Sequence, residues 1–162
     1  MLHFFIDKHN LSKKSILFPK NIRDEHDKAA QLIRIKHDPV MDVKIKDAYP
    51  VLNQSYYYED DHYLIRPPKD FDEFVQEGTK LLHCVCSNGY YKGHVEGTRL
   101  IFFIRKKKKP GVPYFTVEYS PASKRVIQCH GYRHMKPVPK VKGFTKEWLG
   151  RFTGAYDKKI AA

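Results

Sequence analysis

Residues 99–131 read RLIFFIRKKKKPGVPYFTVEYSPASKRVIQCHG and contain three strand-like runs separated by two turns. The opening run RLIFFIR is apolar without alternation, which is typical of a central strand covered on both faces. A basic turn leads into the strand-like run PYFTVEY, and the turn SPASK separates that run from a third one, RVIQCHG. The spacing of these turns predicts a three-stranded antiparallel meander.

Helical periodicity is found on both sides of the meander. We expect helices over residues 21–37, 40–49, 70–81 and 145–158. Pro50 should stop the second helix, and Asp70, with Glu73 three residues later, should cap the third. Short strands are expected near residues 56–58 and 63–65. The sequence therefore predicts an α+β fold, with N-terminal helices and a C-terminal helix packed on a small antiparallel sheet.

The length and composition favour one domain. A chain of 162 residues with 41% hydrophobic content can form one core, so we interpret residues 1–162 as a helical segment at 1–55 and an α+β core at 56–162. No run approaches the roughly 18 apolar residues that span a bilayer, and charge appears too early for a secretory signal. Three cysteines do not suggest a disulfide framework. We expect a cytoplasmic protein with reduced thiols and no membrane partner.

Positive charge is concentrated in the second part of the chain. Residues 1–98 hold 14 Lys and Arg against 15 Asp and Glu, whereas residues 99–162 hold 16 against 3. This asymmetry favours a polyanionic partner such as nucleic acid, because each cation that meets a phosphate releases condensed counterions. Solubility is the alternative explanation of a basic surface.

Strand alternation predicts a polar face on the meander. Successive side chains of a strand point to opposite faces, so Gln128 and His130 should face away from Ile127 and Cys129. If the hairpin pairs apolar residues with apolar residues, Glu118, Gln128 and His130 converge on one side. Ile127 and Cys129 are then expected in the core.

Residues 81–87, LLHCVCS, leave three alternatives open: half of a zinc site, a thiol nucleophile with its base, or a buried strand. As a strand they would place Cys84 and Cys86 on one side and His83 on the other. No Cys-x-x-Cys pair is present elsewhere in the sequence to complete a four-ligand zinc site. The sequence therefore favours structural cysteines and no metal. His83 precedes a polar loop, where it is either a phosphate contact, an acid or base, or a structural histidine.

Two stretches carry a resemblance to a known family. Residues 82–119, LHCVCSNGYYKGHVEGTRLIFFIRKKKKPGVPYFTVEY, are followed by VIQCHG at 126–131. In this order they resemble the C-terminal region of the PcfJ-like family, proteins carried by phages and by conjugative plasmids of Gram-positive bacteria. The resemblance extends over LIRPPKDFDEFVQEGTKL at 64–81 and, more loosely, ILFPKNIRDEHDKAA at 16–30. It implies mobile-element DNA processing or phage biology, with other mobile-element proteins as partners.

The chain departs from the family pattern at three places. The family commonly has a second histidine where this sequence has Leu82, and Gly where Cys86 stands. It also tends towards a Gly-Lys-x-Asn unit where residues 131–134 read GYRH. The resemblance therefore implies no required metal ligand at Cys86, and we expect neither a metal nor a cofactor.

Two functions follow as hypotheses. The first is a DNA- or RNA-binding protein whose basic half contacts phosphates. Tyr90 and Tyr91 lie in a short predicted helix, where either ring stacks on a base or fills the core. The candidate contacts are Tyr90, Tyr91, Arg105, Lys106, Lys107, Lys108, Lys109, Arg125 and Arg133. The second is an enzyme acting on nucleic acid or nucleotide, nuclease-like or ADP-ribosyltransferase-like, with His83, Glu118 and Gln128 in one pocket. Glu118 would be its general base or a metal ligand.

Overall fold

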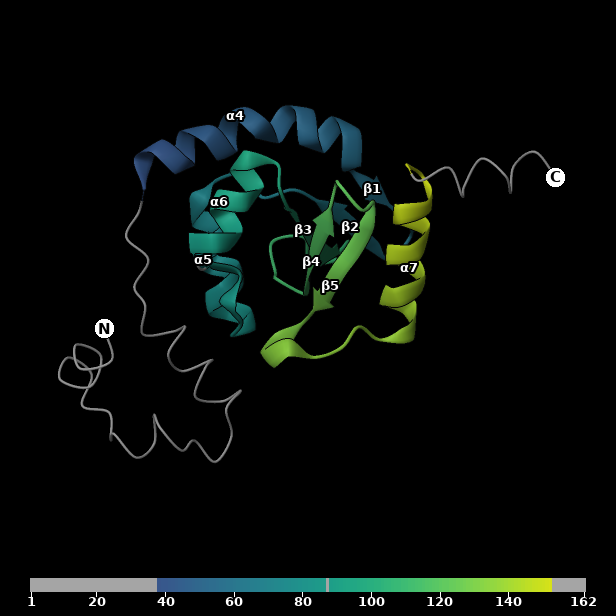
Figure 1. Ribbon diagram of the computed structural model, residues 1–162. Coiled ribbons are helices and arrows are strands. Elements are labelled where there is room, and N and C mark those ends of the chain that lie inside the picture. The colour runs from purple at the N-terminus through teal and green to yellow at the C-terminus, as the bar shows by residue number, and fades with distance from the viewer. Residues whose placement is uncertain (1–37, 87, 153–162) are drawn as a thin grey trace, which may run out of the picture.

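The computed structural model of the protein describes residues 38–86 and 88–152, whose elements form three layers (Figure 1). The helices are α4 (Pro39–Tyr56), α5 (Phe71–Leu81), α6 (Asn88–Glu96) and α7 (Pro139–Gly150). The strands are β1 (Tyr58–Glu59), β2 (Tyr63–Arg66), β3 (Leu100–Lys106), β4 (Phe115–Ser120) and β5 (Arg125–His130). Two 3₁₀ turns are η1 (Cys84–Cys86) and η2 (Tyr132–His134). None of the helices in these ranges is both long and apolar enough to cross a membrane.

The sheet confirms the predicted α+β fold and its meander. Its strand order is β1-β2-β3-β4-β5, and every neighbouring pair is antiparallel. Strand β3 is central, and all its residues except the last, Lys106, are buried. The unbroken apolar run of this strand follows from its position, since helices cover both faces of the sheet there.

One face of the sheet packs on α7. Phe102, Val117 and Trp148 are fully buried in this layer, and Phe144 is nearly so. The Trp148 Nε1–H donates to the Tyr56 carbonyl at 2.7 Å, which ties α7 to the end of α4. A buried indole N–H usually finds such a partner, so this bond contributes to fixing the helix position.

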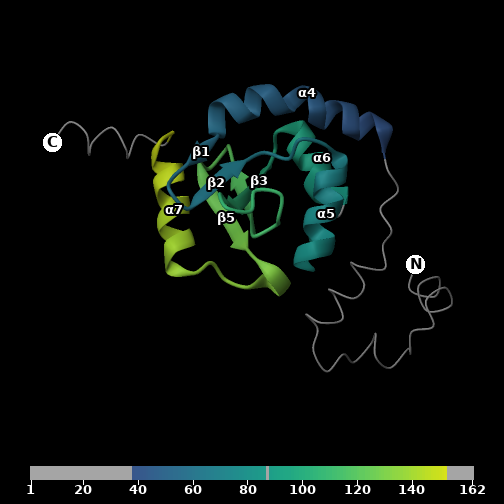
Figure 2. The ribbon, with the colours of Figure 1, turned by 180° about the vertical axis from the view of Figure 1, so that it is seen from behind.

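The opposite face packs on α5 and α6. Phe71 and Phe74 of α5 bury their rings against Ile101 and Phe103 of β3, and Ile45 of α4 joins the same cluster. Figures 1 and 2 show α4 lying along one edge of the molecule, from the side of α5 and α6 to that of β1 and α7. The core is therefore split by the sheet into two parts.

Helix α4 corrects one prediction. Asp38 caps it by accepting from the Val40 and Met41 N–H groups, at 3.0 and 3.1 Å. The helix then continues through Pro50 to Tyr56 instead of stopping at residue 49. Pro50 is exposed, so the cost of the missing N–H is reduced because water can solvate the unpaired carbonyl. The helix predicted for residues 21–37 lies outside the described residues.

Helix α7 begins earlier than predicted. Its first residue is Pro139, not residue 145, because proline suits the first helical position, where an N–H would have no helical partner. Phe144 and Trp148 are buried, while Leu149 and Phe152 pack against the same core. Helix α7 ends at Gly150, and residues 153–158 of the predicted helix lie outside the described part.

Candidate functional site

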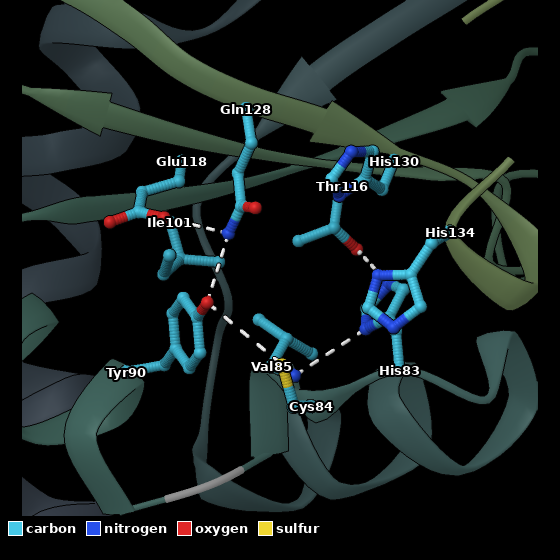
Figure 3. A pocket seen from close by; sticks show the side chains of 10 residues that line it. All are labelled: His83, Cys84, Val85, Tyr90, Ile101, Thr116, Glu118, Gln128, His130 and His134. Atoms are coloured by element: carbon cyan, nitrogen blue, oxygen red, sulfur yellow. Dashed lines mark hydrogen bonds between the residues drawn. The ribbon is translucent and has the colours of Figure 1, made fainter. Parts of the chain in front are cut away.

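A small cavity lies between the β4–β5 hairpin and the segment that joins α5 to α6 (Figure 3). The cavity is small and has room for one water molecule or one small polar group. Its lining consists of His83, Cys84, Val85, Tyr90, Ile101, Thr116, Glu118, Gln128, His130 and His134. The structure thus brings His83, Glu118 and Gln128 to one cavity.

The segment after α5 is a tight turn, not the strand that was considered for it. Leu82 ends α5 in the left-handed region at φ 52°, and residues 84–86 form the 3₁₀ turn η1. The two sides of a strand therefore do not separate His83 from Cys84, and both line the cavity. Cys84 is half-buried there. The side chain of Cys86 lies outside the described part.

The β4–β5 pairing supplies the opposite wall of the cavity. Glu118 pairs with Gln128 and Thr116 pairs with His130, so the predicted polar face forms. The register shifts after Glu118, and Val126 pairs with Tyr119. This bulge leaves Ile127 57% exposed, which corrects its predicted place in the core. Cys129 does pack against the core, and burial raises its pKa to about 12.

Glu118 is the centre of one polar network. Gln128 Nε2 donates to Glu118 Oε2 at 2.7 Å and to the Tyr90 hydroxyl at 3.0 Å. The Cys84 thiol donates to the same hydroxyl at 3.9 Å. Burial raises the pKa of Tyr90, so the phenol is neutral at physiological pH and keeps a proton to donate. The network therefore holds a carboxylate, an amide and a phenol beside the cavity.

Arg99 completes this network and was not identified from the sequence. Its Nη1 lies 3.3 Å from Glu118 Oε1, and its guanidinium carbon lies 5.3 Å from the Tyr90 ring centroid. A Cβ at Gly93 would fall 2.6 Å from Arg99 Cγ, so α6 can approach the arginine closely only because residue 93 is glycine. The signal that could have indicated Arg99 was a cation directly before a central strand.

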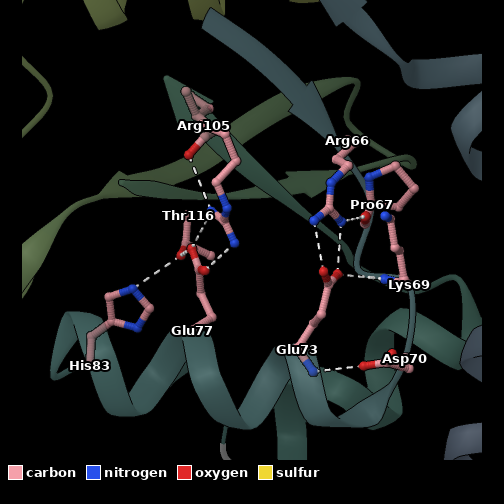
Figure 4. A network of polar contacts seen from close by, with 10 residues as sticks. Arg66, Pro67, Lys69, Asp70, Glu73, Glu77, His83, Arg105 and Thr116 are labelled. Atoms are coloured by element: carbon pink, nitrogen blue, oxygen red, sulfur yellow. Dashed lines mark hydrogen bonds and ion pairs between the residues drawn. The ribbon is translucent and has the colours of Figure 1, made fainter. Parts of the chain in front are cut away.

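A second network links His83 to the buried ion pair of α5 and β3 (Figure 4). His83 Nε2 lies 3.1 Å from the Thr116 hydroxyl, which donates to Glu77 Oε1 at 2.7 Å. Arg105 binds both oxygens of Glu77, with Nη2–Oε2 at 2.5 Å and Nη1–Oε1 at 3.2 Å. Burial raises the pKa of Glu77, while Arg105 and the Thr116 hydroxyl act in the opposite direction.

These bonds favour one tautomer of the His83 ring. The Thr116 proton is used on Glu77, so the Thr116 oxygen accepts and His83 Nε2 carries the hydrogen. The Val85 N–H donates to His83 Nδ1 at 3.4 Å, which requires a lone pair on that nitrogen. Both contacts are satisfied by the neutral ring. His83 and Glu118 thus line the same cavity but belong to separate hydrogen-bond networks.

Two further histidines close the end of the cavity near η2. The rings of His134 and His83 have centroids 6.0 Å apart, and those of His134 and His130 are 5.4 Å apart. Arg133 and His134 both have positive φ, 48° and 58°, and this unusual turn precedes Met135, whose carbonyl accepts from Gly131 N–H. Within residues 38–86 and 88–152, no cluster of three or more His, Cys, Asp or Glu is arranged to hold a metal ion.

Two of the predicted nucleic-acid contacts are buried. Arg105 is 4% exposed and paired with Glu77, so its assignment to phosphate binding does not fit its position. Tyr91 is 7% exposed and packs edge-on against Phe71, with ring centroids 5.1 Å apart, so its ring cannot stack on a base. Tyr90, the other candidate tyrosine, is half-buried, and the guanidinium of Arg99 lies over one face of its ring.

The remaining basic candidates are exposed but separated. Lys106 ends β3, and Lys107, Lys108 and Lys109 lie in the turn that follows. Arg125 lies at the other end of the sheet, where β5 begins, so it does not extend that lysine cluster. Arg133 lies in η2, beyond the end of β5. The basic residues therefore form more than one surface patch.

Comparisons with known proteins agree with the resemblance in the sequence. The chain is 28% identical over 145 residues to the uncharacterized protein Lin1253/Lin1744 of Listeria innocua, an alignment that covers 85% of this chain and 30% of that protein. The chain thus spans about a third of the length of this curated relative. No solved structure matches it. The PcfJ-like protein family matches residues 3–142, and the chain belongs to that family.

Proposed function

We propose that this protein binds nucleic acid and that the lysines of the β3–β4 hairpin are its main phosphate contacts. The observation that supports this most is the exposure of four consecutive lysines, Lys106, Lys107, Lys108 and Lys109, at one turn. Residues 99–162 also carry 16 Lys and Arg against 3 acidic residues. Clustered cations favour a polyanion because each phosphate contact releases counterions.

Two of these lysines have partners within the protein that a phosphate can replace. Lys106 Nζ lies 4.4 Å from the centroid of the Tyr114 ring, and Lys107 Nζ lies 3.0 Å from Glu59 Oε1. Both members of the Lys107–Glu59 pair are exposed, and such pairs contribute little to stability in water. The hairpin can therefore exchange these contacts for phosphates at small cost to the fold.

A charge-matched pair of variants tests the proposal. In one variant the four hairpin lysines are changed to Gln; in the control, Lys44, Lys69, Lys80 and Lys92, four exposed lysines outside the basic half, are changed to Gln. The affinity for a single-stranded oligonucleotide and its dependence on salt are then measured. We expect the hairpin variant to lose affinity and most of its salt dependence, and the control to lose little. Equal losses in both variants would contradict a specific role of the hairpin.

A second candidate function is favoured by the cavity itself. Glu118 is 8% exposed beside a water-sized space, which suits a general base in an enzyme acting on nucleic acid or nucleotide. Gln128 would orient Glu118, and His83 would contribute the third polar group of the cavity. Glu118→Gln and His83→Ala should then abolish turnover of DNA, RNA or a nucleotide without unfolding the chain. Turnover at the wild-type rate in both variants would exclude this function.

A further inference from the structure

Two arginines lie at the end of the sheet opposite to the lysine hairpin. Leu100, the residue after Arg99, pairs with Tyr119 of β4. Arg125 pairs with Ser120, the residue that follows Tyr119. Strands β3 and β5 therefore bring Arg99 and Arg125 to the same end of the sheet on either side of β4. Their Cα atoms are two strand spacings apart, about 10 Å.

Both arginine side chains belong to the face of the sheet that carries the cavity. Arg99 reaches Glu118, whose side chain lines the cavity. Ser120 is two residues after Glu118 and lies on the same face, and its partner Arg125 shares that face because cross-strand neighbours point to one side. Val126 packs into the core under the opposite face, as alternation from Arg125 requires.

The aliphatic stem of the Arg99 side chain is packed, while its guanidinium group stays accessible to solvent. Gly93 allows α6 to contact the aliphatic stem, and the Tyr90 ring lies 5.3 Å from the guanidinium carbon. The side chain of Arg99 is nevertheless 41% exposed. Arg125 is exposed as well. This end of the sheet therefore presents two guanidinium groups to solvent on the face that carries the cavity.

We propose that Arg99 and Arg125 together bind a phosphate group at the mouth of the cavity, in competition with Glu118. A guanidinium has five N–H donors in a planar fork that matches phosphate oxygens, and the contact of Arg99 Nη1 with Glu118 Oε1 is long, at 3.3 Å. Gln128 holds the other oxygen of Glu118, so the carboxylate keeps its place when Arg99 turns towards a phosphate. The proposal rests on the nucleic-acid-binding function and adds a second phosphate contact to it.

If Glu118 competes with phosphate for Arg99, its removal should raise the affinity for an oligonucleotide, whereas removal of a purely structural ion pair should not. In Glu118→Gln the amide oxygen still accepts from Gln128, but Arg99 is released from its carboxylate. We expect the affinity for a single-stranded oligonucleotide to rise about fivefold, as loss of one competing ion pair of about 1 kcal/mol allows. Glu147→Gln on α7 is the control, because it changes the net charge equally on the opposite face. Equal effects of the two substitutions would overturn the proposal.

The arginines themselves provide the second arm of the test. Arg125→Gln and Arg99→Gln should each weaken oligonucleotide binding and reduce the salt slope by about 0.7, as expected for one lost phosphate contact on a single strand. In the double variant Arg99→Gln with Glu118→Gln, the gain from Glu118→Gln should disappear. An unchanged salt slope in Arg125→Gln, which alters an exposed side chain, would overturn the two-arginine site.

The outcomes separate this site from the nucleic-acid proposal. If the hairpin variant loses affinity while both arginine variants bind like the wild type, the arginine site fails and nucleic-acid binding stands. If the wild type binds no oligonucleotide, nucleic-acid binding fails, and titration with adenosine monophosphate judges the site alone. If Glu118→Gln binds the mononucleotide and Arg99→Gln does not, the arginines form a phosphate site. If neither variant binds it, there is no phosphate site at these arginines.

Discussion

His83 Nε2 lies 3.1 Å from the Thr116 hydroxyl, and this contact joins the end of helix α5 to strand β4 across 33 residues of sequence. It also connects the cavity to the buried pair of Glu77 and Arg105, through the Thr116 proton on Glu77. A histidine held in this way is part of the support of the cavity wall. Its effect on any function is therefore coupled to the stability of the α5–β4 contact.

Removal of Arg105 should destabilise the fold strongly. Arg105→Ala leaves the Glu77 carboxyl, which is 0% exposed, without its cationic partner. Loss of one member of a buried pair typically costs about 3–5 kcal/mol in the free energy of unfolding. Chemical denaturation of the variant and the wild type measures this difference. A loss below about 1 kcal/mol would show that the pair contributes little to the free energy of unfolding.

His94 should make stability depend on pH in the acidic range. It is buried against Phe74, its Nδ1 accepts from Ile101 N–H at 3.0 Å, and burial lowers its pKa to about 4. The unfolded chain binds the proton from about pH 6.5 downward, whereas the folded chain does so only near pH 4. Stability is therefore full above pH 6.5 and falls as the pH drops towards 4.

The variant His94→Asn isolates this effect. The asparagine oxygen can accept from Ile101 N–H in place of Nδ1 but does not titrate. Between pH 6.5 and 4 we expect the wild type to lose about 3 kcal/mol more of its unfolding free energy than the variant, since one extra proton is bound on unfolding. Parallel pH profiles for the two proteins would show that His94 is not the group responsible.

Gly93 should be needed for the position of Arg99. Alanine at residue 93 gains helix propensity but places its Cβ at 2.6 Å from Arg99 Cγ, so the arginine must move. Gly89→Ala in the same helix is a matched control, because its Cβ would meet nothing within 4 Å. We expect Gly93→Ala to be less stable than Gly89→Ala by about 1 kcal/mol or more. Equal thermal unfolding midpoints would mean that Arg99 adapts without strain.

Cys129 should resist modification in the folded protein. Its pKa of about 12 leaves almost no thiolate at neutral pH, and the thiol packs against the core. Alkylation by iodoacetamide, followed by peptide mass spectrometry, should label Cys129 only after denaturation and should label the half-buried Cys84 faster. Rapid labelling of Cys129 in native buffer would contradict the burial of this thiol.

The meander and its polar face could be predicted from the sequence because they depend on local regularities. The unbroken apolar run of residues 100–104 indicated a central strand, and alternation placed Glu118 and Gln128 on one face. The same alternation failed at Ile127, where a bulge inserts one residue into β5. A bulge is set by the pairing of two strands, so a single run of residues does not reveal it.

The parts that were missed depend on tertiary contacts or on unusual backbone geometry. Leu82 adopts a left-handed backbone conformation that is rare for leucine, so the sequence does not predict it. Residues 83–86 therefore form a turn instead of a strand, and this turn brings Cys84 to the cavity. Arg105 looked like part of a basic surface run because its partner Glu77 stands 28 residues earlier. Its place in alternation with Ile101 and Phe103 was a signal that it points inward.

Binding of nucleic acid through the hairpin lysines should appear as a salt-dependent affinity. The logarithm of the association constant of the wild-type chain for a single-stranded oligonucleotide is measured against the logarithm of the salt concentration. With the four hairpin lysines on phosphates, we predict a linear decrease with a slope of about −3 or steeper, at roughly −0.7 per neutralised phosphate. A slope near zero, or no binding at low salt, would contradict nucleic-acid binding through these lysines.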